Sequence, residues 1–352
     1  MKMKAAVLYE INKPLIIEEI EVPNPDMGQV FVKVMSSGIC HTQLDNVKGK
    51  YGNDPYLPHL LGHEGAGVVE KIGPGVTRVA PGDHVILSWI QGPGFNAKTP
   101  LYTKGTQKIN AGPVTTFNEY TIASENRITK IRDDVSFDVA SIIGCAVSTG
   151  LGAVLNESKV QTGASVAVFG IGGIGLNIIQ GAALVNALKI IAVDIHADKL
   201  DVAQKFGATH VINAKKEDPV KKIKELTDGK GVDYAFESAG LKETMEQAYQ
   251  AACNTGLINL VGNPTHNEKI CIDALQTHYG KQLIGGHGGH TRPDVDFARY
   301  ISLYQAGKLK IDELITHRYK LDDVNVAIDD MQAGHVGRAI IELSHAARKR
   351  KR

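Results

Sequence analysis

Three potential metal ligands, two cysteines and one histidine, stand in glycine-containing segments of the first half of the chain. They are Cys40, His63 and Cys145. Two thiolates and an imidazole form a tetrahedral zinc set that leaves one position open for water or a substrate. A metal held in this way is a Lewis acid, which polarises a carbonyl group or lowers the pKa of a bound alcohol. Spacing alone leaves the alternative that each residue is an ordinary buried side chain.

A glycine-rich segment in the second half of the chain has the spacing of a dinucleotide-binding turn. The apolar stretch 165–169 runs directly into 170–175, whose sequence is GIGGIG, and a helical pattern follows. Gly170 permits a tight turn, Gly172 lets the backbone approach a pyrophosphate, and Gly175 allows the helix to pack closely against the strand. The phosphates would then lie at the positive end of that helix.

The residue that ends the next apolar stretch indicates which nicotinamide cofactor the chain binds. Asp194 stands about 20 residues after the last glycine, where a carboxylate accepts hydrogen bonds from the ribose hydroxyls of NAD. The same charge repels the 2′-phosphate of NADP, and the next residues, Ile195 and His196, include no arginine to bind that phosphate. The sequence therefore predicts NAD, with a structural turn and an incidental aspartate as the alternative.

Two different sequence patterns along the chain predict two domains. In the first part, short alternating stretches such as 30–34 and 67–72 are bounded by turn residues, which is typical of a barrel-like β domain. From about residue 162, helix-length segments alternate with apolar stretches at 165–169, 189–193, 210–212, 232–236 and 257–261. This alternation predicts a parallel sheet with helices on both faces. After about residue 284 the alternation ends, and we expect the remaining chain to return to the first domain.

Composition and charge limit the partners of the chain. Hydrophobic residues make up 43% and charged residues 22%, the balance of a globular protein, and four dispersed cysteines do not form a disulfide framework. We find no apolar run close to the ~20 residues needed to span a bilayer. The formal net charge of +1 gives no general attraction to nucleic acid. We therefore expect a cytoplasmic protein without membrane or nucleic-acid partners, and we interpret the basic run 346–352 as a solvated tail.

Taken together, these motifs resemble the zinc-containing alcohol dehydrogenases of the medium-chain dehydrogenase/reductase superfamily. The resemblance covers nearly the whole chain, from the metal-ligand segments through the glycine-rich turn to 321–338. It implies an α/β protein with a GroES-like β-rich catalytic domain, residues 1–147 and 284–352. A doubly wound Rossmann domain, residues 148–283, would bind NAD. The implied activity is hydride transfer between NAD(H) and a small-molecule alcohol, aldehyde or ketone, and the implied assembly is a homodimer or homotetramer.

The resemblance also assigns roles to individual residues. Cys40, His63 and Cys145 match the catalytic zinc ligands. Glu64 matches an acidic neighbour that can itself bind zinc, and Thr42 matches the hydroxyl that hydrogen-bonds the substrate oxygen.

Further matches concern the substrate pocket and the cofactor. Trp89 matches an aromatic residue of the substrate pocket, for which Tyr102 is a further candidate. Among the cofactor contacts, His41 and Arg338 match pyrophosphate-binding positions. The complete set of implied cofactor contacts is His41, Thr149, Gly170, Gly172, Gly173, Ile174, Gly175, Asp194, Lys199 and Arg338.

Three departures from the family pattern change what we expect. The stretch 89–116, which usually carries four cysteines around a structural zinc, contains none, so we predict one catalytic Zn²⁺ per subunit and no structural zinc. Gln43 replaces the aspartate that supports the zinc-bound histidine. Its amide can accept a hydrogen bond from the imidazole N–H, but it raises the basicity of His63 less than a carboxylate would. Asp45 replaces the histidine that often ends the proton relay.

Two other functions remain as alternatives at this point. The first is a metal-free NAD(P)H-dependent quinone or enone reductase of the same superfamily, which metal analysis would distinguish from a zinc enzyme. The second is a non-catalytic NAD-binding redox sensor, tethered to nucleic acid by its basic tail. That protein would be retained on DNA in a salt-dependent way that disappears when 346–352 are deleted.

Overall fold

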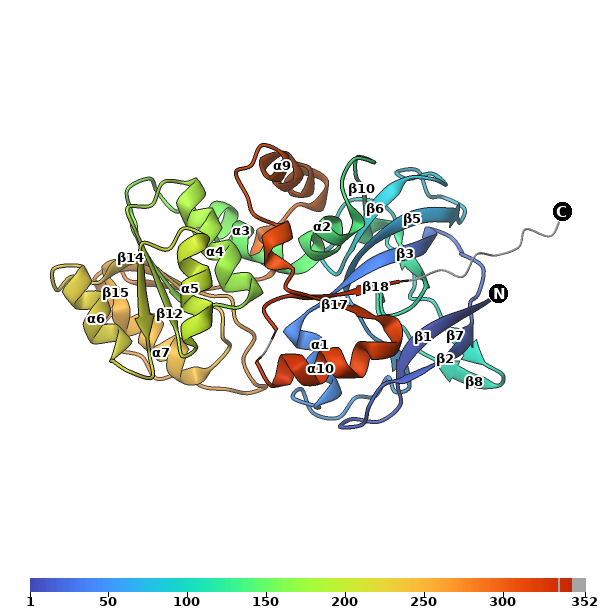
Figure 1. The fold of residues 1–352 in the computed structure, drawn as a ribbon, viewed down its shortest axis with the longest axis horizontal. Helices are drawn as coiled ribbons and strands as arrows, with labels where there is room; N and C mark the ends of the chain where they lie inside the picture. The colour runs from blue at the N-terminus through green and yellow to red at the C-terminus, as the bar shows by residue number, and fades with distance from the viewer. Residues whose placement is uncertain (335, 344–352) are drawn as a thin grey trace. The chain divides into compact units, whose positions relative to one another are not determined.

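The computed structural model describes residues 1–334 and 336–343, and the chain divides into two compact units (Figure 1). Unit 1 comprises Met1–Cys145, Arg292–Ser302 and Ile311–Arg352, and unit 2 comprises Ala146–Thr291 and Leu303–Lys310. The sequence placed the borders differently, since 284–291 and 303–310 belong to unit 2. The first of these segments includes the end of an edge strand of unit 2, and the second is anchored where Lys310 N donates to Gln180 Oε1. The basic run 346–352 lies outside the described residues.

The described part of unit 1 contains two β-sheets. The first has the strand order β4-β1-β2-β7-β8, with β1 (Lys2–Leu8), β2 (Ile16–Glu21), β4 (His59–Leu60), β7 (Tyr102–Lys104) and β8 (Gln107–Ile109). The second has the order β10-β6-β5-β3-β18-β17 with β9 paired to β3, and consists of β3 (Gln29–Ile39), β5 (Glu64–Ile72), β6 (His84–Ser88), β9 (Tyr120–Ser124), β10 (Ile128–Lys130), β17 (His317–Lys320) and β18 (Ala339–Glu342). The α-helices of the described part of unit 1 are α1 (His41–Val47), α2 (Phe137–Ile142), α10 (Val324–Gln332) and most of α9 (Pro293–Gln305), whose last residues belong to unit 2.

Strand β3 is the centre of unit 1 and determines where the candidate site lies. It pairs antiparallel with β5, β9 and β18, so most of its residues are buried. The pairing with β18 places Ala339 opposite Ile39, which brings the C-terminal part of the chain beside the end of β3. The pairing with β5 places Ser37 opposite Gly65, so the end of β3 and the start of β5 are neighbours.

Unit 2 is a parallel α/β fold, which confirms the predicted class. Its six strands follow the order β13-β12-β11-β14-β15-β16 and are β11 (Ser165–Phe169), β12 (Lys189–Asp194), β13 (His210–Asn213), β14 (Val232–Glu237), β15 (Ala252–Leu260) and β16 (Gln282–Gly285). Figure 1 shows helices packed around this sheet, among them α4 (Gly173–Leu184), α5 (Ala197–Lys205), α6 (Pro219–Leu226) and α7 (Lys242–Ala251). The short helix α8 (Leu275–His278) follows. The sequence pattern missed β16, in which no residue is fully buried and only Leu283 and Ile284 are large and apolar.

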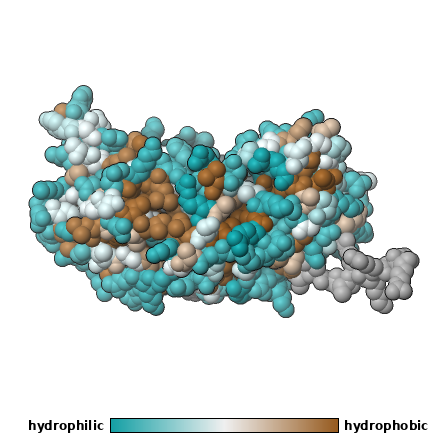
Figure 2. All heavy atoms as spheres, turned by 90° about the horizontal axis from the view of Figure 1, so that it is seen from above, coloured by the Kyte–Doolittle hydropathy of each residue, from teal (hydrophilic) through white to brown (hydrophobic). Residues whose placement is uncertain are grey.

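One helix is longer and more apolar than the sequence pattern suggested. Phe137–Glu157 is 21 residues long and by length and composition could cross a membrane, but 89% of its apolar window is buried within the protein. It consists of α2, a π-helical segment Ile143–Val147, α3 (Ser148–Gly152) and a second π-helical segment Ala153–Glu157. Its apolar composition therefore reflects packing inside the protein. Figure 2 shows a surface that is mostly hydrophilic, with hydrophobic patches between.

Candidate metal and nucleotide sites

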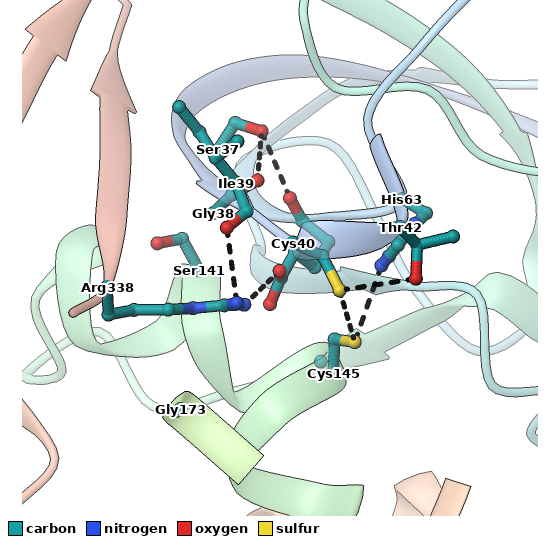
Figure 3. Close-up of polar contacts among 12 residues, drawn as sticks. Ser37, Gly38, Ile39, Cys40, Thr42, His63, Ser141, Cys145, Gly173 and Arg338 are labelled. Carbon is teal, nitrogen blue, oxygen red and sulfur yellow. Dashed lines mark hydrogen bonds and ion pairs between the residues drawn. The ribbon is translucent and has the colours of Figure 1, made fainter. Parts of the chain in front are cut away.

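The metal-ligand candidates of unit 1 converge on one point. One ligand atom from each of Cys40, His63, Glu64 and Cys145 lies within 4.8 Å of the others, and among the described residues this is the one such group. The two sulfur atoms are 3.9 Å apart, and His63 Nε2 lies 3.3 Å from Cys145 Sγ. Figure 3 shows the side chains of Cys40, His63 and Cys145 pointing toward one another.

Local structure explains why residues so far apart in sequence meet. Cys40 lies between β3 and α1, and His63 immediately precedes β5, so the antiparallel pairing of the two strands brings both residues together. Cys145 lies in the π-helical segment that follows α2. Single π turns widen a helix locally and are frequent at functional sites, and this one positions Cys145 in the cluster.

The electrostatics of the cluster favour a divalent cation. The Cys145 thiol donates a hydrogen bond to Cys40, which lowers the pKa of Cys40 well below its usual value against the opposing effect of burial. The same contact, together with burial, raises the pKa of Cys145 well above its usual value. Burial lowers the pKa of His63, but the neighbouring Cys40 thiolate outweighs burial and raises it. The contact thus favours the thiolate of Cys40 and the thiol of Cys145, and a bound cation would favour ionisation of both.

Gln43 contacts His63 as the sequence predicted, but with the opposite polarity. Its buried side chain accepts a hydrogen bond from Gly62 N at 2.7 Å through Oε1, and its Nε2 lies 2.6 Å from His63 Nδ1. Because the backbone of Gly62 occupies the amide oxygen, the amide nitrogen is left to donate to the imidazole. That the Gln43 oxygen accepts the imidazole proton therefore stays a prediction for the metal-bound site.

A buried ion pair that the sequence did not predict lies beside the cluster. Arg338 Nη2 donates to Glu64 Oε1, and Arg338 Nη1 donates to the Ile39 carbonyl at 3.2 Å. Burial raises the pKa of Glu64 to about 7, although the charge of Arg338 opposes this shift. Burial lowers the pKa of Arg338, but Glu64 outweighs it and raises the pKa above its usual range. Glu64 Oε2 has no hydrogen-bond partner among the described residues, so one carboxylate oxygen stays available next to the sulfurs.

Helix α1 carries the hydroxyl and the basic residue that the sequence singled out. Thr42 Oγ1 lies 3.6 Å from Cys40 Sγ, beside the metal-ligand cluster. The side chain of His41 is 66% exposed, and its Nε2 lies 3.8 Å from Asp45 Oδ1. Asp45 also accepts hydrogen bonds of 3.2 Å from Lys50 and Tyr51, two partners that the sequence pattern did not identify.

The two aromatic candidates for a substrate pocket have different environments. The ring of Trp89 lies edge-on to that of His63, with centroids 6.5 Å apart, and its backbone N–H donates to the His63 carbonyl. Tyr102 is fully buried among apolar residues, and its hydroxyl accepts a hydrogen bond from Ile122 N. Tyr102 is therefore a core residue and the suggestion that it lines a pocket is wrong.

The glycine-rich turn of unit 2 has the shape of a phosphate-binding loop. Gly170 has a φ of +90°, and a Cβ atom there would approach Ala239 N to 2.9 Å. At Gly175 an added Cβ would clash with the Gly170 carbonyl oxygen, because α4 packs directly against the turn. At Gly172, in contrast, a Cβ would meet no atom within 4 Å. This open space at the N-terminus of a 12-residue helix fits a pyrophosphate.

The other cofactor candidates of unit 2 lie around this turn or along its helices. Asp194 ends β12, and its two carboxylate oxygens accept hydrogen bonds from Ile171 N and His196 N. The carboxylate therefore also fixes the glycine-rich turn, a role that spacing did not reveal. Thr149 is buried in α3, and its hydroxyl has no hydrogen-bond partner among the described residues. Gly173 and Ile174 begin α4, and Lys199 lies in α5.

Known proteins match this chain over almost its full length. Residues 26–133 match the family model of the alcohol dehydrogenase GroES-like domain, and residues 173–305 match that of the zinc-binding dehydrogenases. The S-(hydroxymethyl)glutathione dehydrogenase of Paracoccus denitrificans is 37% identical over 97% of this chain and 100% of the relative. The alcohol dehydrogenase class-P of Arabidopsis thaliana is 34% identical over 97% of this chain and 98% of the relative.

A solved structure agrees with these sequence relatives. The benzyl alcohol dehydrogenase from Acinetobacter calcoaceticus has a TM-score of 0.89 and is 32% identical, with 98% of this chain and 100% of that chain covered. This chain carries two candidate sites on the fold that it shares with these proteins. One is the group of sulfur and imidazole ligand candidates, and the other is the glycine-rich dinucleotide turn. The chain therefore belongs to the zinc-containing alcohol dehydrogenases of the medium-chain dehydrogenase/reductase superfamily and is an enzyme that transfers hydride between an alcohol and NAD.

Proposed function

We propose that Cys40, His63 and Cys145 hold one catalytic Zn²⁺ per subunit, with Glu64 as an additional ligand when substrate is absent. The observation that supports this proposal is the convergence of four donor atoms within 4.8 Å in a buried part of unit 1. Two sulfurs and one imidazole nitrogen suit a catalytic zinc, which keeps one position open. When bound, zinc supplies a Lewis acid that lowers the pKa of an alcohol, and NAD supplies the hydride acceptor.

The residues around the cluster are proposed to orient the metal ligand, contact the substrate and transfer protons. Thr42 is placed beside Cys40 and is proposed to accept the proton of the substrate hydroxyl. Gln43 orients the imidazole of His63 through its contact with Nδ1. The edge-on ring of Trp89 excludes water from one side of His63 and contacts the substrate. Asp45 connects α1 to Lys50 and is proposed to carry protons toward the surface.

For the cofactor, we propose that the open face of Gly172 and the first turn of α4, with Gly170, Gly173 and Gly175, bind the pyrophosphate. Asp194 binds the ribose hydroxyls, and Lys199 lies near the same sugar. The unpaired hydroxyl of Thr149 and the side chain of Ile174 contact the nicotinamide. Two residues of unit 1 are proposed as further phosphate contacts, namely His41 and Arg338. The exposure of His41 supports its assignment, whereas Arg338 already binds Glu64 and Ile39.

We further propose that no structural zinc is needed, because hydrogen bonds hold the stretch 89–116. Glu125 accepts hydrogen bonds from Phe95 N, Thr77 N and Arg78 N. Ser124 Oγ accepts from Ala97 N and donates to the Phe95 carbonyl. These contacts hold the first part of the stretch 89–116 in place without the four cysteines that would bind a structural zinc.

The location and assembly of the enzyme are also proposals. The four cysteines are all unpaired, which agrees with a reducing compartment such as the cytoplasm. Exposed apolar side chains on unit 2, such as Leu241, Leu275 and Tyr279, support self-association as a homodimer or homotetramer. Substrates are expected to be small-molecule alcohols and aldehydes, as the names of the relatives suggest.

Zinc analysis of the purified protein tests the proposal. We expect about one zinc per subunit by elemental mass spectrometry, because the three ligands of a catalytic site with one open position bind a single ion. Cys145→Ala should lose the metal and turnover while NAD binding, measured by calorimetry, stays nearly unchanged. Cys271→Ala, which removes an exposed thiol outside the cluster, is the matched control and should keep both. A zinc content near zero that added zinc does not restore would favour the metal-free reductase, and two zincs per subunit would contradict the single-site proposal.

A further inference from the structure

A cavity of about 860 Å³ opens beside the imidazole of His63. Gln43, Gly62 and His63 form one part of its wall, and the segments 51–56 and 110–115 form most of the rest, so every lining residue belongs to unit 1. Small-molecule sites have volumes of about 300–1,000 Å³, and this cavity lies near the upper end. A substrate of the size of ethanol would fill only a small part of it.

The lining of this cavity combines apolar surface with polar side chains. Its neutral hydrogen-bonding side chains include Asn46, Tyr51, Asn53, Thr99 and Asn110. Among the described residues that line it there is no lysine or arginine. Lys50, which lies between the lining residues Gly49 and Tyr51, pairs with Asp45.

The one carboxylate in the wall is paired with an imidazole. His59 Nε2 lies 2.6 Å from Asp54 Oδ2, and His59 Nδ1 lies 2.9 Å from the Leu60 carbonyl oxygen. Asp54 therefore already occupies His59. A substrate carboxylate would meet no lysine or arginine in the lining, and an unpaired buried carboxylate is costly.

We propose that this cavity binds the part of the alcohol remote from the reacting hydroxyl and selects large, uncharged alcohols with further hydrogen-bonding groups over alcohols that carry a carboxylate. The inference rests on the proposed function, because it takes His63 as a ligand of the catalytic metal. The neutral amides and the tyrosine hydroxyl in the wall hydrogen-bond the substrate, and the Asp54–His59 pair sets the preference for neutral substrates.

Two probes of nearly equal size test the charge preference. These are 4-(hydroxymethyl)benzamide, which is neutral, and 4-(hydroxymethyl)benzoate, which is anionic. With the zinc-loaded enzyme and NAD, we expect kcat/KM for the amide to exceed that for the carboxylate by at least about tenfold, as for a site that must bury an unmatched charge. Equal values, or a preference for the carboxylate, would overturn the proposal.

Two variants connect that preference to the cavity. In the wild type, Asp54 Oδ1 accepts a hydrogen bond from Tyr56 N at 2.9 Å. Asp54→Asn keeps this acceptor but removes the carboxylate that occupies His59, so that His59 can bind a substrate carboxylate. It should reduce the preference for the amide about tenfold. Asp134→Asn, at an exposed carboxylate that pairs with Arg132 and does not line the cavity, is the matched control and should leave the preference unchanged.

The second variant, Gly112→Leu, reduces the volume of the cavity. A side chain at Gly112 fits the backbone, because an added Cβ meets only the Val114 carbonyl at 3.6 Å. Gly112→Leu should therefore fold and fill part of the cavity, raising KM for the amide about tenfold while KM for ethanol changes little. If neither Asp54→Asn nor Gly112→Leu changes the kinetics of either probe, the cavity does not bind substrate.

A binding measurement separates failure of this inference from failure of the proposed function. If the zinc-loaded protein oxidises no alcohol at all, the proposed function fails. Binding of the two probes can still be followed by saturation-transfer NMR on the same protein. Binding of the amide that Gly112→Leu abolishes would still support the cavity assignment. If wild type and Gly112→Leu bind both probes equally well, the cavity assignment is overturned.

Discussion

The amide of Gln43 contacts the imidazole of His63 at 2.6 Å while its oxygen accepts the backbone N–H of Gly62 at 2.7 Å. One side chain thus fixes the ring orientation of a proposed metal ligand relative to the turn that carries it. In this arrangement the amide donates to Nδ1, whereas an imidazole that binds a metal through Nε2 carries its proton on Nδ1. Metal binding therefore requires the Gln43 amide to rotate and give up its contact with Gly62.

Replacing Gln43 with glutamate should tighten zinc binding. A carboxylate of the same length accepts from both Gly62 N and a protonated His63 Nδ1, so no hydrogen bond is lost when the metal binds. Removing or supplying such an outer partner changes metal affinity by about 10–100-fold, so we expect the zinc Kd to fall by at least about tenfold. Competition with a chromophoric chelator measures this change. Gln43→Leu should weaken binding, and an unchanged Kd in both variants would show that Gln43 does not orient the ligand.

Glu125 should stabilise the fold in a pH-dependent way. Burial raises the pKa of Glu125, but hydrogen bonds from three backbone N–H groups outweigh burial and lower it. A carboxyl group whose pKa is lowered by folding stabilises the protein above its unfolded pKa, and this contribution is lost as pH falls through the folded pKa. Hydrogen bonds to charged groups contribute about 1.5–3 kcal/mol, so Glu125→Gln should lower the free energy of unfolding by that amount at pH 7.

Unfolding by urea at several pH values measures this effect. The difference in the free energy of unfolding between Glu125→Gln and the wild type should be largest at neutral pH. It should shrink as the pH falls below the ordinary pKa range of a glutamate. Glu70→Gln, which changes a carboxylate on the exposed part of β5, is the control. A difference that stays constant down to acid pH would show that the charge of Glu125 does not support this stretch.

Two neighbouring glycines should respond differently to the same added methyl group. Gly172→Ala meets no protein atom within 4 Å, so its melting temperature should stay near that of the wild type. NAD binding should weaken at least about tenfold, because the methyl group occupies the space proposed for the pyrophosphate. Gly175→Ala clashes with the Gly170 carbonyl and should lower both stability and NAD affinity. Calorimetry with NAD and thermal unfolding test the pair, and unchanged NAD affinity in Gly172→Ala would place the phosphates elsewhere.

The Asp194 carboxylate should decide between NAD and NADP. Asp194→Ser removes the charge that repels a 2′-phosphate, so we expect the ratio of kcat/KM for NAD over NADP to fall by at least about tenfold. Part of the loss with NAD will come from the turn itself, since Asp194 also accepts hydrogen bonds from Ile171 N and His196 N. Asp194→Asn keeps an acceptor for one of those N–H groups and separates the two effects. No change in the ratio would show that Asp194 does not contact the ribose.

Local sequence patterns, together with the family resemblance they support, predicted the fold class and the candidate residues of both sites. Parallel strands are largely buried on both faces, so short, mostly apolar stretches indicated five of the six strands of unit 2. The glycine-rich turn has a fixed spacing because its backbone must approach phosphates, which makes it readable from residues 170–175. Cysteine and histidine are chemically distinctive, so the candidate metal donors could be named before any contact was known.

The tertiary structure decided how these residues act together. The ion pair between Arg338 and Glu64 joins residues that only the pairing of β18 with β3 brings together, and no local pattern encodes that pairing. The polarity of the Gln43 contact depends on where the backbone N–H of Gly62 points. The cavity beside His63 is formed by loops without a periodic signal, and Asp54 and His59 of its wall pair with each other. Such properties depend on distances between remote segments, which sequence spacing does not specify.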